Sequence, residues 1–124
     1  MFKENSKAIY LQIADRITDD ILSGVLQAGQ RLPSVREYAM TVQVNPNTMM
    51  RTYEHLAQAG VIYNRRGIGF FVSDNALDIV HCQRSASLLD DELNGIFRQL
   101  DLLGITPQQL FDRYKAFTEN SKKD

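Results

Sequence analysis

The apolar residues near the start of the chain recur at helical spacing, with polar residues between them. Four isoleucines stand four residues apart: Ile9, Ile13, Ile17 and Ile21. A stripe with this period lies on one face of an α-helix, so an amphipathic helix is predicted over residues 8–23. Gly24 can end this helix, because glycine readily takes the left-handed conformation that closes many helices.

Two more helices are predicted close together in the next part of the chain. Ser34 and Glu37 form the pattern of a capping box, in which each side chain accepts a hydrogen bond from the other residue's amide. They precede a predicted helix over residues 35–42. Asn45 is a good N-cap and is followed by proline, which suits a first helical position, so another helix is predicted over 46–59. Two short helices joined by about three residues are typical of a helix-turn-helix.

A β-hairpin is predicted directly after these helices. Residues 61–64 and 70–72 are rich in β-branched and aromatic side chains. The segment between them, residues 65–69, carries two arginines and two glycines and suits a turn. A hairpin in this place is a wing. The fold predicted for residues 1–74 is therefore a winged helix-turn-helix, mostly α with a small β-hairpin wing.

The periodicity changes in the last part of the chain. Apolar residues recur there at alternating spacings of three and four, over about three heptads; they are Ile79, Cys82, Ala86, Leu89, Leu93, Ile96, Leu100 and Leu103. Such a seam pairs with another helix, and Cys82 within it is expected to be a buried thiol. A capping pattern from Thr106 to Gln109 starts one more helix. We therefore predict that residues 75–124 form a two-helix dimerisation unit.

The composition of the 124 residues excludes several classes of protein. A single cysteine rules out an intramolecular disulfide and a cysteine-based metal cluster, and the histidines His55 and His81 are too isolated for a metal pair. Phosphate-binding, dinucleotide-binding and nucleophile motifs are absent, so neither an enzyme nor a cofactor is expected. No signal-peptide pattern or apolar run of membrane-spanning length occurs, so we expect a cytoplasmic protein without a membrane partner.

The distribution of charge is more informative than the net charge of -1. Residues 31–67 contain five arginines but only two glutamates and no lysine or aspartate. Binding to phosphates requires local positive charge rather than a high overall pI. A scatter of solvated surface arginines would give the same count, so charge alone does not decide between the two explanations.

Several segments within residues 8–72 resemble the GntR family of bacterial regulators. Among them are Gly29-Gln30-Arg31-Leu32-Pro33-Ser34-Val35-Arg36-Glu37, Val44-Asn45-Pro46-Asn47-Thr48 and Arg65-Arg66-Gly67-Ile68-Gly69-Phe70-Phe71-Val72. Each segment alone is unspecific, whereas their order and spacing are specific. The short C-terminal part resembles the YtrA-type subfamily, in which two helices stand in place of a large effector-binding domain and are assigned to dimerisation.

The resemblance implies a set of DNA-contacting residues in the helix-turn-helix and the wing. They are Ser34, Arg36, Asn45, Asn47, Thr48, Arg51, Arg65, Arg66 and Gly67. Arginine can bind guanine bidentately and asparagine can bind adenine in the same way, and the family's wing enters the minor groove. Helix capping by the serine, asparagine and threonine residues, and plain solvation of the arginines, remain alternatives. Pro46 and Met50 replace arginines of many family members, so base preference cannot be transferred.

The function expected from these features is sequence-specific transcriptional regulation. A homodimer would bind double-stranded DNA at an inverted repeat and repress by occluding a promoter, with a small-molecule effector as an open question. One alternative is a winged-helix module that binds protein instead of DNA. Another is a sensor that takes a small apolar ligand in its dimer groove.

Overall fold

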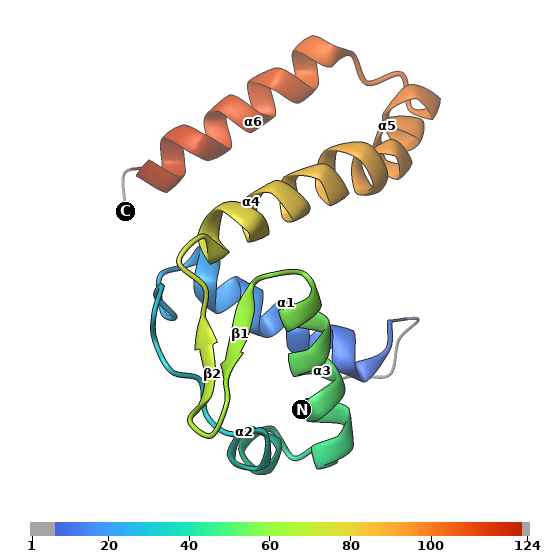
Figure 1. Cartoon of the computed structure of the whole chain (residues 1–124). Helices are drawn as coiled ribbons and strands as arrows, with labels where there is room; N and C mark the ends of the chain where they lie inside the picture. The colour runs from blue at the N-terminus through green and yellow to red at the C-terminus, as the bar shows by residue number, and fades with distance from the viewer. Residues whose placement is uncertain (1–6, 123–124) are drawn as a thin grey trace. The chain divides into compact units, whose positions relative to one another are not determined.

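The computed structural model describes residues 7–122 and divides the chain into two compact units, of which the first ends at Arg84 and the second begins at Ser85. The first unit contains α1 (Ile9–Leu22), α2 (Val35–Val42), α3 (Pro46–Gln58), β1 (Ile62–Arg65), β2 (Gly69–Val72) and most of α4 (Ala76–Ala86). The second contains a π-helical segment η1 (Ser87–Glu92), α5 (Leu93–Leu102) and α6 (Pro107–Lys122). Figure 1 labels the α-helices and strands and shows their order along the chain by colour.

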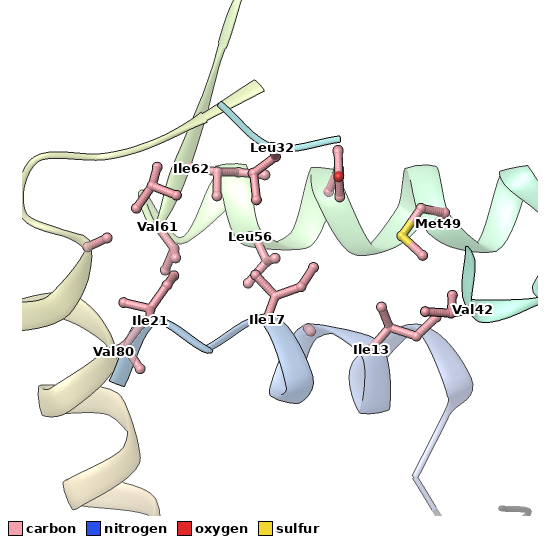
Figure 2. Close-up of a cluster of buried hydrophobic side chains, with 14 of the residues drawn as sticks. Ile13, Ile17, Ile21, Leu32, Val42, Met49, Leu56, Val61, Ile62 and Val80 are labelled. Atoms are coloured by element: carbon pink, nitrogen blue, oxygen red, sulfur yellow. The ribbon is translucent and has the colours of Figure 1, made fainter. Parts of the chain in front are cut away.

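The core of the first unit forms between the apolar faces of α1 and α3. Figure 2 shows Ile13, Ile17 and Ile21 of α1 facing Met49 and Leu56 of α3. All five side chains are buried. Burying one such side chain contributes about 1.5–3 kcal/mol, so the four-residue spacing of the isoleucines specifies where α1 packs. The predicted helix over 8–23 is confirmed.

The helix-turn-helix begins at the caps that the sequence predicts. The amide of Glu37 donates to Ser34 Oγ at 3.1 Å, and the amide of Ser34 donates to Glu37 Oε1 at 3.2 Å. The amide of Asn47 donates to Asn45 Oδ1 at 2.7 Å, which starts α3. Between the two helices Gln43 has a φ of 61°, a left-handed conformation that side chains other than glycine, asparagine and aspartate rarely adopt.

The wing is an antiparallel hairpin in which Ile62 pairs with Val72 and Arg65 with Gly69. The segment before α2 lies along the free edge of β2. The amide of Leu32 donates to the Phe70 carbonyl at 2.8 Å. This strand-like pairing covers an edge that would otherwise expose unpaired backbone groups. The glycines and the proline in residues 24–33 indicate a loop. The pairing of this segment with β2 is therefore not predictable from the sequence.

The first unit extends past the boundary that the sequence predicts at residue 74. Ala76 and Val80 of α4 are buried in its core, and Ile79 packs against that core. A Cβ atom at Gly60 would lie 3.4 Å from Ile79 Cδ1. The first turns of α4 therefore complete the winged-helix core, and Ile79 is half-buried within its own chain rather than free for a dimer seam.

The apolar seam from Ile79 to Leu103 predicts one regular α-helix across this segment. This expectation is wrong in one respect, because the π-helical segment η1 interrupts the α-helix. A π-turn adds a residue to the helical repeat, and each added residue rotates the remainder of the helix by about 100°. The heptad seam is therefore not one continuous face. None of the residues in the range 85–122 is buried, so within one chain the described part of the second unit has no core of its own.

Candidate nucleic-acid interface

The elements predicted to meet DNA gather at one end of the first unit. Figure 1 shows α2, the beginning of α3 and the hairpin turn at this end. A hydrogen bond joins the turn to the segment before α2, because Arg31 Nη2 donates to the Ile68 carbonyl at 2.7 Å. The residues predicted from separate parts of the sequence are thus carried by connected elements.

The start of α2 presents Arg36 to solvent, while Ser34 is engaged in the capping box. Among the described residues Arg36 has no hydrogen bond or ion pair, so its guanidinium is available for a ligand. Hydrogen bonds from the Ser34 side chain, and then from the Ser34 amide, lower the pKa of Glu37. A charged Glu37 therefore keeps the first turn of α2 fixed.

One face of α3 is buried and the opposite face is open. Asn47, Arg51, Glu54 and Gln58 are exposed, whereas Thr48 is half-buried. The side chain of Asn45 accepts a hydrogen bond from the backbone. The exposed set has the character expected of a recognition helix, with polar and charged side chains near the N-terminus.

Arg51 is held by an aromatic ring from α1, which sequence reasoning did not find. Its Cζ atom lies 4.0 Å from the centroid of the Tyr10 ring, within the range of a cation–π interaction. The backbone of Tyr10 is fixed to α3 by a hydrogen bond from Thr52 Oγ1 to the Tyr10 carbonyl at 2.8 Å. The His55 ring contacts the Tyr10 ring edge-on at 5.9 Å between centroids. Tyr10 therefore restricts where the Arg51 guanidinium can lie.

Tyr53 fixes α3 against the segment that leads into α2. Its side chain is fully buried, and its hydroxyl donates to the Pro33 carbonyl at 2.6 Å. Its ring packs edge-on against Tyr38 and Phe70. Burial raises the pKa of Tyr53 far above its ordinary value, so the hydroxyl keeps the proton that it donates.

The wing turn exposes two arginines on a backbone that glycine makes possible. The amide of Ile68 donates to the Arg65 carbonyl at 2.8 Å, and Gly67 within this turn has a φ of +80°. The guanidinium of Arg65 lies 5.4 Å from the centroid of the Phe71 ring. Arg66 is exposed and has no hydrogen bond or ion pair to any described residue. The turn thus presents positive charge beside a residue without a Cβ.

The residues of the predicted dimer seam differ in exposure. Leu93 and Leu100 are half-buried, like Ile79. The others are exposed: Cys82, Ala86, Leu89, Ile96 and Leu103. The thiol that the sequence predicts to be buried is therefore open within one chain. The role of the seam residues in dimerisation stays a prediction.

Neither a metal-binding cluster nor a membrane-spanning helix occurs among the described residues. Residues 7–122 contain no group of three His, Cys, Asp or Glu side chains that could hold a metal ion. Within the same range, no helix has both the length and the apolar character needed to cross a bilayer.

The fold and the exposed residues together define a winged helix-turn-helix DNA-binding domain. The family model for bacterial regulatory proteins of the gntR family matches residues 9–72, which span α1 to the end of the wing. The chain belongs to this family.

Several relatives match the chain over most of their own length. The HTH-type transcriptional regulator YhcF of Bacillus subtilis is 40% identical over 116 residues, which are 94% of each chain. The HTH-type transcriptional repressor YtrA of the same organism is 29% identical over 95% of this chain and 90% of its own length. A putative GntR-family regulator from Bacteroides thetaiotaomicron has a crystal structure that superposes with a TM-score of 0.79, at 49% identity over 92% of this chain and 99% of that one. This chain is accordingly a DNA-binding transcriptional regulator rather than an enzyme.

Proposed function

We propose that the protein binds an inverted-repeat operator as a homodimer and represses transcription by occluding the promoter. The observation that carries this proposal is the open apolar surface of the second unit. Leu102 is 85% exposed, Leu103 74% and Phe117 67%, while no residue in 85–122 is buried. Apolar surface of this kind marks an interface. A second copy supplies the missing core.

A two-fold dimer explains the form of the operator. Two identical DNA-binding units related by a two-fold axis read the same sequence on opposite strands, which produces an inverted repeat. Repression by occlusion then requires only that the dimer cover the promoter. The relative YtrA is named a repressor.

The roles proposed at the DNA follow the exposure of each side chain. Arg36, Asn47 and Arg51 meet base edges or phosphates in the major groove. Arg66 and Gly67 enter the minor groove, with Arg65 at its rim. The N-cap residues Ser34 and Asn45 orient backbone amides toward phosphates, and Thr48, in the first turn of α3, contacts a phosphate with its hydroxyl.

Selection of bound sequences from random double-stranded DNA tests the function directly. We expect an enriched inverted repeat at near-physiological salt. Arg36→Ala should lower affinity for that repeat and, if it removes a phosphate contact, reduce the slope of log K against log salt by about 0.9. Arg98→Ala is the matched control, because it removes the same charge from an exposed position on α5. A folded protein that enriches no sequence would contradict the proposal and favour a protein-interaction module.

The dimer is tested by placing a charge in the proposed interface. Leu93→Asp should give monomers in light scattering, because a buried carboxylate without a partner is costly. Asn94→Asp adds the same charge to the neighbouring exposed position and should remain dimeric. A Leu93→Asp protein that stays dimeric would show that this leucine packs within its own chain.

The apolar-sensor alternative has a separate signature. The second unit contains a hollow of about 470 Å³ lined in part by Leu100, Ile105 and Leu110. A small apolar ligand bound there would raise the melting temperature in a concentration-dependent way. A second copy seated on the same surface would exclude the ligand, so thermal shift and light scattering separate the two occupants.

A further inference from the structure

Arg84 joins α4 to α1 through one terminal nitrogen. Its Nη2 atom lies 2.8 Å from the Asp15 carbonyl, 2.6 Å from Thr18 Oγ1 and 2.7 Å from Asp19 Oδ1. Thr18 is only 7% exposed, and its hydroxyl donates to the same Asp15 carbonyl at 3.0 Å. Three acceptors on α1 thus converge on a single guanidinium from a residue far along the chain.

Arg84 lies beyond the apolar contacts that hold α4 on the first unit. The apolar anchors of α4 on the first unit are Ala76, Ile79 and Val80, all near the start of the helix. Arg84 lies one turn further and is the last residue of the first unit. The last turn of α1 contains Asp19 and Asp20 but no basic residue of its own, so the guanidinium brings a positive charge to an acidic end of that helix.

We propose that Arg84 is a positioning residue that sets the half-site spacing accepted by the dimer. This inference rests on the proposed homodimer and its inverted-repeat operator. Along the chain, α4 is followed directly by the second unit, which carries the proposed dimer contact. With Arg84 in place, α4 is fixed on α1 by apolar contacts near its start and by polar contacts near its end. Without Arg84, only the first turns of α4 are held.

The half-site spacing that a dimer accepts depends on how rigidly α4 is held on α1. One added base pair separates two half-sites by about 3.4 Å and rotates one against the other by about 35°. A dimer gains avidity only if both units can engage together. A rigidly held α4 confines the dimer to one spacing, whereas an α4 that pivots on its first turns lets both units engage on neighbouring spacings.

The test measures the affinity of the full-length protein for operators whose half-sites are one base pair closer, unchanged or one base pair further apart. For Arg84→Met, which keeps an aliphatic chain, the preference for the unchanged spacing should fall about three- to tenfold. Asp19→Ala should act in the same direction, because it removes the charged acceptor. Asp20→Ala is the control, since within residues 7–122 only the backbone carbonyl of Asp20, and not its carboxylate, accepts hydrogen bonds.

The possible results separate a positioning role of Arg84 from a purely structural one. An equal loss of affinity at all three spacings would show a purely structural contact and would overturn the inference. So would an unchanged preference in a folded, dimeric Arg84→Met protein. If the wild-type protein bound a single half-site as tightly as any pair, the proposed function would fail as well, and the wild-type measurement alone would show this.

Discussion

Replacing Tyr10 tests whether the ring beneath Arg51 contributes to DNA affinity. In Tyr10→Leu the guanidinium loses a ring centroid 4.0 Å away. At an exposed site this interaction contributes about 0.5–1 kcal/mol, and an unrestrained arginine costs a similar amount to order on binding. We therefore expect operator affinity to fall about two- to fivefold, less than the loss of about 1–3 kcal/mol expected for Arg51→Ala.

The assay is a double-mutant cycle measured by fluorescence anisotropy on a labelled operator. Tyr10→Phe keeps the ring and should bind like the wild type. In an Arg51→Ala background, Tyr10→Leu should have no further effect, because the ring would have nothing left to position. An additive loss would refute the reasoning and assign Tyr10 an effect independent of Arg51. Tighter binding by Tyr10→Leu would show that Arg51 must leave the ring to reach DNA.

Three predictions concern the helix-turn-helix framework. Tyr53→Phe should lower the free energy of unfolding by about 1–2 kcal/mol in urea titration, because the Pro33 carbonyl loses its donor; no loss would mean that water replaces the hydroxyl. Gln43→Gly should raise the same free energy by about 0.5–1 kcal/mol, since relief of the left-handed strain exceeds the entropy cost of glycine, and a lower value would contradict this balance. The lowered pKa of Glu37 gives a stabilisation that is complete above the ordinary value of 4.5 and is lost as pH falls through the lower folded value. Glu37→Gln should therefore lose less stability than the wild type when thermal unfolding is compared at pH 5 and pH 3; equal losses would exclude Glu37.

The sequence predicted those parts of the molecule that depend on local chemistry and simple periodicity. The capping box at Ser34 and the cap at Asn45 begin α2 and α3 at the expected residues. The isoleucine stripe located the buried face of α1. The order of polar and basic residues on α3 and in the wing turn identified the exposed surface that the structure brings to one end of the unit.

The parts that were missed depend on contacts between distant segments or on the local helical repeat. Nothing around Tyr10 or Arg84 in the sequence indicates a partner, because each pairs with a residue more than a helix away. Ile79 fits the heptad spacing, but its side chain packs against the core of the first unit. The π-segment at Ser87–Glu92 changes the repeat without changing the apolar spacing, so periodicity alone could not reveal it.

Under the proposed homodimer, the lack of a core in residues 85–122 of a single chain would tie the activity of the protein to its abundance. At protein concentrations below the dimer dissociation constant, most chains would be monomers. The concentration of dimers would then rise with the square of the total protein concentration. Operator occupancy would therefore increase more steeply with protein concentration than it would for a stable dimer. Halving the number of chains at cell division would lower the concentration of dimers by more than half. The stability of the second unit would follow the same mass action, because a core that forms only in a dimer has a melting temperature that depends on concentration.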